Sequence, residues 1–284
     1  MEIKQIHPAK WRDTVDPFSL SYHNFQLDKI IGYPHAGNDV FHVQGIHEGK
    51  SITAYIKVAR QKGAAIENEV AILSQLDGSI YPQVIDFDCK SKPFSVTTDM
   101  PGIRLSSIVG ENEDMLSLSY LEEYGEALGK LHNMILSATQ QVDRRFFHCP
   151  SEDVLEKLNI SYMADYFRKQ PSANVTVFCH GDFHYANVLW DGSHISAILD
   201  FELSGYGNRD FDIAWALFLR PGQKFLKTRK EREKFLEGYS KHGTYDPEAV
   251  RYYMAQCYVH FLRFCGDDTE YCKYVRSWLI DNCT

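Results

Sequence analysis

The pattern of apolar and polar positions over the first hundred residues predicts an antiparallel sheet and one helix. Five runs have the composition of strands, and turn-forming residues separate them. The connection 48–50, which contains glycine, is tight enough for a hairpin. Residues 64–76 instead place Ile66, Val70 and Leu73 on one face of a helix. The strand-like runs are 25–31, 39–46, 51–58, 81–88 and 93–100.

Beyond Gly102 the apolar spacing becomes helical, and capping residues mark where several helices begin. Ser119 and Thr228 each precede a glutamate by three positions, which is the capping-box pattern. Asp246 followed by Pro247 is typical of a helix start. We expect helices over 119–136, 151–168 and 228–239, and further helices that begin near 210, 246 and 268.

Two short apolar runs, 175–179 and 195–199, interrupt the helical region, and we expect them to form a hairpin-like unit. The whole pattern predicts an α+β protein, and 284 residues suffice for one large domain or for two lobes.

Composition narrows the class of protein. The 284 residues are 44% hydrophobic and 24% charged, as in ordinary globular proteins. The net charge of -8 argues against a general nucleic-acid partner. It suits cationic substrates, although plain solubility explains it equally well. Seven scattered cysteines without a C-x-x-C pair, and no secretory leader, favour reduced thiols and a cytoplasmic location. No apolar run approaches the roughly 20 residues of a membrane span, and the sequence leaves monomer and homodimer open.

Oxygen-bearing side chains gather at the ends of the two short apolar runs. Asp182 follows the first run, Asn187 lies in the same loop, and Asp200 follows the second run. Phosphoryl transfer needs such a set, because one carboxylate orients the attacking hydroxyl and other oxygens hold magnesium. Each residue alone could serve only a turn or a loop. A rival hypothesis is a zinc hydrolase, because His180, Asp182 and His184 alternate.

The segment from His180 to Asn187 has the form H-G-D-x-x-x-x-N, and Asp200-Phe-Glu follows it. The two together resemble the catalytic and metal-binding segments of the aminoglycoside phosphotransferase family, small-molecule kinases with a protein-kinase-like fold. The resemblance implies a two-lobed α+β fold, with a small sheet-based, nucleotide-binding lobe over 1–99 and a larger, mostly helical lobe for catalysis and acceptor binding over 100–284. The resemblance spans about 25–264. It implies that Asp182 is the catalytic base, that Asn187 and Asp200 bind Mg²⁺, and that ATP or GTP is the donor. Asp212 matches the family's second aspartate, which steadies the catalytic loop.

The resemblance extends to nucleotide contacts in the N-terminal region. It implies that Lys57 holds the α and β phosphates and that Glu69, preferred over Glu67, holds Lys57. The run 93–100 ends where the kinase hinge falls. The carbonyl of Thr98 and the N–H of Met100 would therefore bind the purine.

The loop between the first two strand-like runs takes the position of a phosphate-covering loop. By resemblance, Gly37 and Asn38 would lie near the phosphates. The loop lacks G-x-G-x-x-G, so an ordinary glycine turn explains it equally well.

The acceptor is the least defined part of the prediction. The resemblance implies a hydroxyl on a small molecule, either an aminoglycoside or a metabolite such as choline, homoserine, a methylthio-sugar or a fructosamine. A nucleotide-binding protein without catalysis is a further alternative. Candidate acidic pocket residues are Glu202, Asp210, Asp267, Asp268 and Glu270, although we prefer a solvated acidic loop for the last three. Candidate residues for a sugar or amino-alcohol pocket are His184, Tyr185 and Trp190.

Overall fold

The computed structural model describes residues 14–34, 37–60, 63–90, 92–171, 175–264 and 269–284. The chain divides into two compact units. The first unit comprises Met1–Gly102 and Ser196–Leu203, and the second comprises Ile103–Ile195 and Ser204–Thr284. Residues 196–203 belong to the first unit, although the chain reaches them long after Gly102. None of the described helices is long and apolar enough to cross a membrane.

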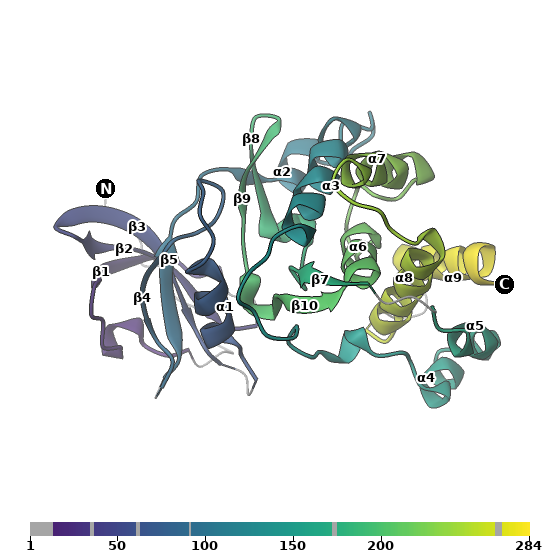
Figure 1. Cartoon of the computed structure of the whole chain (residues 1–284), viewed down its shortest axis with the longest axis horizontal. Helices are drawn as coiled ribbons and strands as arrows, with labels where there is room; N and C mark the ends of the chain where they lie inside the picture. The colour runs from purple at the N-terminus through teal and green to yellow at the C-terminus, as the bar shows by residue number, and fades with distance from the viewer. Residues whose placement is uncertain (1–13, 35–36, 61–62, 91, 172–174, 265–268) are drawn as a thin grey trace. The chain divides into compact units, whose positions relative to one another are not determined.

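The first unit is built on a five-stranded antiparallel sheet with the order β1-β2-β3-β5-β4 (Figure 1). Phe41 lies opposite Ile56 in this sheet, and both side chains are fully buried. Glu48 and Gly49 turn the β2–β3 hairpin with φ values of 49° and 74°, as the predicted tight connection requires. The strands are β1 (Gln26–Gly32), β2 (Asp39–His47), β3 (Lys50–Val58), β4 (Val84–Asp88) and β5 (Phe94–Thr98).

Helix α1 (Ile66–Leu73) lies beside β4 and β5 (Figure 1) and is shorter at both ends than predicted. Its apolar face is buried, and so is the carboxylate of Glu69, which is 4% exposed. The helix also packs against the short 3-10 turn Phe201–Leu203. These contacts explain why residues 196–203 belong to the first unit.

The two short apolar runs predicted to pair as a hairpin have other partners in the structure. β7 (Thr176–Cys179) pairs with β10 (Gly205–Asn208). β9 (His194–Ile198) lies in another sheet, with the order β6-β8-β9. The predicted hairpin-like unit is therefore wrong. Two glycines weaken the strand pattern of β10, so the sequence did not reveal the true partner of β7. The other strands are β6 (Ile103–Arg104) and β8 (Val188–Asp191).

Helices α3 (Leu118–His132) and α7 (Arg229–Ser240) approach closely because glycines lie at their contact. A Cβ atom on Gly125 would overlap the carbonyl oxygen of Phe235. One on Gly238 would overlap the carbonyl oxygen of α3 residue Glu122. Only glycine permits backbones to approach this closely.

Of the two predicted capping boxes, one is present at a helix start and the other is not. The box formed by Thr228 and Glu231 is confirmed. The box at Ser119 is wrong, because Ser119 lies inside α3 and Ser117 occupies the N-cap position. The hydroxyl of Ser117 instead donates to Glu231 Oε1 at 2.8 Å. One buried glutamate thus ties together the starts of α3 and α7.

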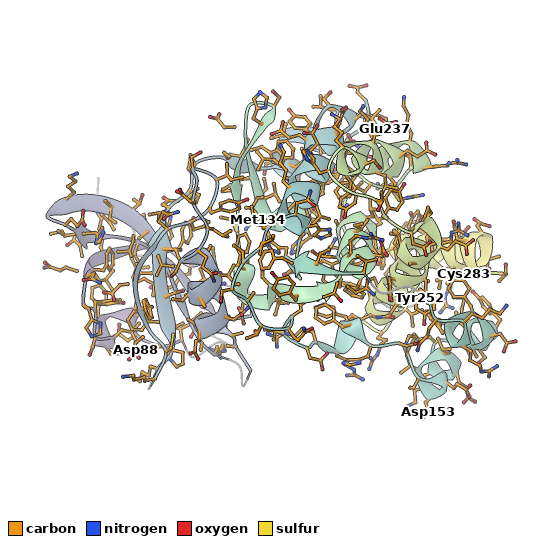
Figure 2. The ribbon with its side chains drawn as sticks, in the orientation of Figure 1. Asp88, Met134, Asp153, Glu237, Tyr252 and Cys283 are labelled. Atoms are coloured by element: carbon orange, nitrogen blue, oxygen red, sulfur yellow. The ribbon has the colours of Figure 1, made fainter. Side chains whose placement is uncertain are left out.

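The helix predicted over 151–168 is also wrong as a single element. Asn159, with a φ of 54°, interrupts it. Tyr252 on α8, labelled in Figure 2, donates its hydroxyl to the carbonyl oxygen of Phe167 at 3.0 Å, which holds this segment against α8. The elements here and in the rest of the unit are α2 (Leu105–Val109), α4 (Glu152–Lys157), α5 (Ala164–Arg168), α6 (Arg209–Leu217), α8 (Pro247–Leu262) and α9 (Glu270–Cys283).

Candidate active site

In the second unit, the loop that carries Asp182 is anchored by a buried carboxylate. The loop leaves β7 at His180, and Gly181 adopts a positive φ of 81°. Asp212 on α6 accepts the backbone N–H of His180 at 2.9 Å and that of Gly181 at 3.0 Å. Two charge-assisted hydrogen bonds from adjacent N–H groups fix the direction in which the chain enters the loop.

Asp212 is itself held by His132 of α3. The Nε2 of His132 lies 3.2 Å from Asp212 Oδ2, and its Nδ1 lies 2.8 Å from the hydroxyl oxygen of Tyr239. With Cys179, His132 and Asp212 bring their ligand atoms within 4.8 Å of one another. Burial raises the pKa of the Cys179 thiol well above its ordinary value. The thiol is then protonated and the carboxylate serves backbone donors, so the cluster supports the loop.

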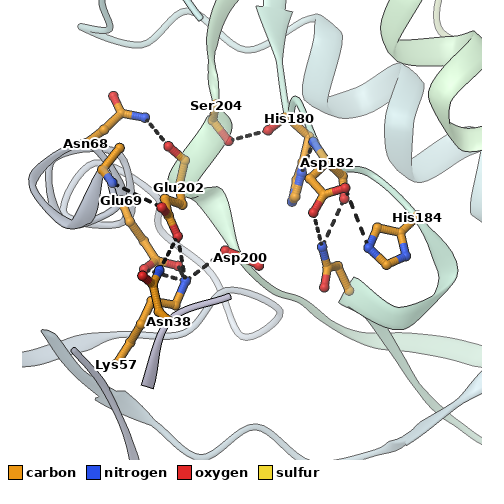
Figure 3. A network of polar contacts seen from close by, with 12 residues as sticks. Asn38, Lys57, Asn68, Glu69, His180, Asp182, His184, Asp200, Glu202 and Ser204 are labelled. Atoms are coloured by element: carbon orange, nitrogen blue, oxygen red, sulfur yellow. Dashed lines mark hydrogen bonds and ion pairs between the residues drawn. The ribbon is translucent and has the colours of Figure 1, made fainter. Parts of the chain in front are cut away.

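The carboxylate of Asp182 is oriented by two side chains within the same unit. Trp215 on α6 donates its indole N–H to Asp182 Oδ1 at 2.8 Å. Asn187 donates its Nδ2 to the Asp182 carbonyl oxygen at 3.0 Å and to Oδ2 at 3.3 Å. His184 Nε2 lies 3.5 Å from Oδ1 (Figure 3). With Nδ2 turned toward Asp182, the amide oxygen of Asn187 remains available as a cation ligand.

The electrostatic surroundings keep Asp182 ionised. Burial alone would raise the pKa of this carboxyl, but His184, Arg220 and the Trp215 N–H outweigh burial and hold the pKa below its ordinary value. Arg220 is 7% exposed, and its guanidinium carbon lies 4.9 Å from the ring centroid of Trp215. Its Nη2 donates to the Trp215 carbonyl oxygen at 2.8 Å. Arg220 therefore fixes the residue that orients Asp182.

A second polar cluster lies in the first unit, around the ammonium of Lys57 (Figure 3). Lys57 Nζ lies 2.9 Å from Glu69 Oε1 and 2.7 Å from Asp200 Oδ1. The ion pair between Lys57 and Glu69 forms as predicted. Glu202 Oε2 lies 3.8 Å from the same ammonium. Three carboxylates thus share one lysine.

The charges of this cluster are unbalanced in favour of negative charge. Burial would lower the pKa of Lys57, but Asp200, Glu69 and Glu202 outweigh it and raise that pKa above its ordinary value. Burial and the neighbouring carboxylates also raise the pKa of Glu69 against the attraction of Lys57. Asp200 has a φ of 67°, and its side chain is 38% exposed. A carboxylate in a strained backbone, exposed beside other carboxylates, suits a divalent cation.

The comparisons with known proteins identify the family of this chain. Residues 30–253 match the phosphotransferase enzyme family, known by the abbreviation APH. The chain belongs to this family. It is therefore a phosphotransferase of the kinase type, and the resemblance seen in the sequence is confirmed. No curated protein matches the chain.

Solved structures show the fold of this phosphotransferase. Plasmodium vivax ethanolamine kinase is 17% identical to this chain, with a TM-score of 0.55. The match covers 92% of this chain and 82% of the ethanolamine kinase chain. A thermostable mutant of aminoglycoside phosphotransferase APH(4)-Ia is 14% identical, with a TM-score of 0.58 and coverages of 93% and 94%. The streptomycin–ATP–APH(2")-IIa complex is 15% identical, with a TM-score of 0.57 and coverages of 87% and 91%. The expected kinase-like α+β fold is confirmed.

The remaining nucleotide contacts stay predictions for this phosphotransferase. Asn38 is 8% exposed, and its Nδ2 donates to Glu202 Oε2 at 2.7 Å, so its side chain supports the Lys57 cluster. Gly37 is exposed, and part of its loop lies outside the described residues. Thr98 ends β5 and accepts the Gln83 N–H on its hydroxyl at 2.9 Å. Met100 lies just beyond, half-buried.

The structure corrects two of the acceptor residues proposed from sequence, Asp210 and Trp190. Asp210 is fully buried against Arg209. Trp190 is 1% exposed, and Glu202 accepts the Ala65 N–H at 3.0 Å within the first unit. Burial therefore withholds Asp210 and Trp190 from an acceptor, and Glu202 belongs to the Lys57 cluster. Asp267 and Asp268 lie outside the described residues, and Glu270 is exposed. His184 and Tyr185, half-buried in the loop after Asp182, remain candidates.

The zinc hypothesis finds no support in the part of the chain that the structure describes. His180 is fully buried, and its ring Nδ1 lies 3.3 Å from the backbone N of Asp182. The one potential ligand cluster found among the described residues does not include His180 or His184.

Sequence reasoning missed Trp215 and Arg220. A signal for Trp215 was present, because it follows Asp212 by three positions and so shares a helix face with it. Arg220 lies beyond the end of α6, and only tertiary packing places it against Trp215.

Proposed function

We propose that this chain transfers the γ-phosphate of ATP or GTP to a hydroxyl of a small molecule, with Asp182 as the catalytic base. The observation that carries the proposal is the Asp182 carboxylate, oriented by Trp215 and held ionised by its surroundings. An ionised carboxylate of fixed direction is what a hydroxyl nucleophile needs. Solved structures of the same fold include complexes with ADP and hygromycin B and with ATP and streptomycin, which supports a nucleotide and a hydroxylated acceptor.

In this reaction the acceptor oxygen forms a bond to the γ-phosphorus, and the bond from that phosphorus to the β–γ bridging oxygen breaks. The nucleoside diphosphate departs with that electron pair. Asp182 orients the acceptor hydroxyl and takes its proton as the new bond forms. Lys57, oriented by Glu69, would bind the α and β phosphates. The transition state is stabilised mainly by position and charge, which both clusters are built to supply.

Mg²⁺ fits the donor set by its chemistry. Asp200 offers an exposed carboxylate and Asn187 an amide oxygen, the hard ligands that this ion prefers. When bound, the ion would neutralise charge on the phosphates.

The test is a screen of hydroxyl-bearing compounds for ADP or GDP release, with Asp182→Ala as the matched background. We expect acceptor-dependent release by the wild type and loss of at least a thousandfold in the variant. The variant should bind nucleotide normally, as judged by thermal shift with ATP and Mg²⁺. Full turnover by Asp182→Ala would overturn the assignment. Nucleotide binding without transfer to any acceptor would favour a non-catalytic binding protein.

A further inference from the structure

A cavity of about 200 Å³ lies in the second unit, between α8 and the segment that leads into α4. The hydrogen bond from Gln256 Nε2 to the Phe146 carbonyl oxygen, at 2.9 Å, joins its two walls. Four basic side chains line the cavity, and no described lining residue is a carboxylate. The four are Arg145, His148, His260 and Arg263.

These basic groups are largely uncompensated. Among the described residues, neither Arg145 nor Arg263 forms an ion pair. His148 is the exception, because its Nε2 lies 2.7 Å from Asp143 Oδ1. Burial lowers the pKa of His260, and the neighbouring charges of Arg263 and Arg145 lower it further. Because His260 favours its neutral form and His148 is paired, the positive charge of the cavity comes from Arg145 and Arg263, in a chain whose net charge is -8.

Two stacked aromatic rings lie between the cavity wall and the proposed catalytic base. Phe146, next to Arg145 in the chain, stacks on Trp215 with ring centroids 4.2 Å apart and an interplanar angle of 18°. Phe146 also makes an edge-on contact with His260, with ring centroids 5.7 Å apart. Trp215 in turn donates to Asp182. The rings of Phe146 and Trp215 thus separate the cavity from the Asp182 carboxylate, which would orient the acceptor hydroxyl.

We propose that this cavity binds an anionic group, a carboxylate or a phosphate, carried by the acceptor. The proposal rests on the proposed kinase function. Arginine pairs bind such groups through parallel N–H donors. The volume is below the roughly 300 Å³ of a pocket for a whole drug-sized ligand, so it suits one end of a small molecule. An acceptor with only ammonium groups, such as an aminoglycoside, would be repelled here.

The first experiment measures anion binding alone. Inorganic phosphate and glycerate are titrated into the wild type, into the double variant Arg145→Gln/Arg263→Gln, and into Arg251→Gln. Arg251 is an exposed arginine at the other end of α8 and serves as the matched control. We expect the double variant to weaken binding at least tenfold and the control to leave it unchanged. No binding to the folded wild type would overturn the proposal. Equal binding to all three proteins would also overturn it, as an adventitious ion only.

The second experiment links the cavity to turnover. Acceptors are offered as matched sets with the same hydroxyl, such as glycerol, glycerate and glycerol 3-phosphate, or homoserine and 3-aminopropan-1-ol. We expect turnover to favour anionic members, with a KM at least tenfold higher in the double variant and an unchanged KM for ATP. Preference for neutral or cationic members would overturn the proposal. Absence of nucleotide binding would instead contradict the kinase function, and the phosphate titration would still test the cavity.

Discussion

Trp215 donates its indole N–H to Asp182 Oδ1 at 2.8 Å, across 33 residues of sequence. This bond joins α6 to the loop that follows β7. The same helix supplies Asp212, which accepts two N–H groups of that loop. One helix therefore fixes both the backbone that enters the loop and the carboxylate at its tip.

Replacing the indole should impair the proposed base without unfolding the protein. Trp215→Phe keeps a ring against Phe146 but removes the N–H donor, so the pKa of Asp182 should rise. We expect kcat to fall roughly tenfold, about 1.4 kcal/mol in activation free energy. The acidic limb of the pH profile of kcat should also move to higher pH, because more of the carboxyl is protonated at a given pH.

The matched control is Trp278→Phe on α9, whose ring packs against Tyr258 rather than Asp182. It should leave the acidic limb unchanged. An identical pH profile for Trp215→Phe and the wild type would show that the indole does not tune Asp182.

Removing the ammonium of Lys57 should weaken nucleotide binding selectively. Lys57→Met leaves Glu69, Asp200 and Glu202 without their shared cation, and these carboxylates would repel the phosphates. We expect the Kd for ATP, measured by calorimetry, to rise at least tenfold while the KM for the acceptor changes little. Lys50→Met, at the exposed start of the same strand, is the control. Equal affinity in both variants would remove Lys57 from the nucleotide site.

The close contact between α3 and α7 predicts a stability effect. The Cβ of Gly125→Ala would overlap the carbonyl oxygen of Phe235, so the helices must separate or strain. We expect a loss of about 1–3 kcal/mol in the free energy of unfolding, measured by urea denaturation. In Gly243→Ala the added atom lies 3.3 Å or more from its neighbours, and the loss should be smaller. Equal losses would mean that the overlap relaxes without cost.

The sequence predicted the sites that depend on short motifs and missed those that depend on distant packing. The family resemblance predicted the contact between Lys57 and Glu69, which the structure shows. The functional roles of these residues and of the 180–187 loop stay predictions. The sequence did not reveal the partner of β7, because β10 is a short strand with two glycines, held by β7 and by the distant segment 139–141. Ser117 takes the N-cap position of α3, and its hydroxyl bonds Glu231, 114 residues away.

The basic cavity illustrates the same limit. Arg145 and Arg263 lie far apart in the chain, and each alone would pass for a solvated surface residue. The fold brings them to one cavity because two residues of α8 hold the segment that contains Arg145. Gln256 binds the carbonyl oxygen of Phe146, and Tyr252 binds that of Phe167 in α5. The net charge of -8 favoured cationic ligands, whereas this cavity favours anionic ones.

The most direct test of the account asks whether Asn187 and Asp200 both bind the cation that accompanies the nucleotide. Mn²⁺, which accepts the same oxygen ligands as Mg²⁺, is titrated into the ATP complex and the free ion is followed by electron paramagnetic resonance. Asn187→Ala and Asp200→Asn should each weaken Mn²⁺ binding at least fivefold, and Asp191→Asn, at the exposed end of β8, should not. Unchanged Mn²⁺ affinity in either Asn187→Ala or Asp200→Asn would contradict the account.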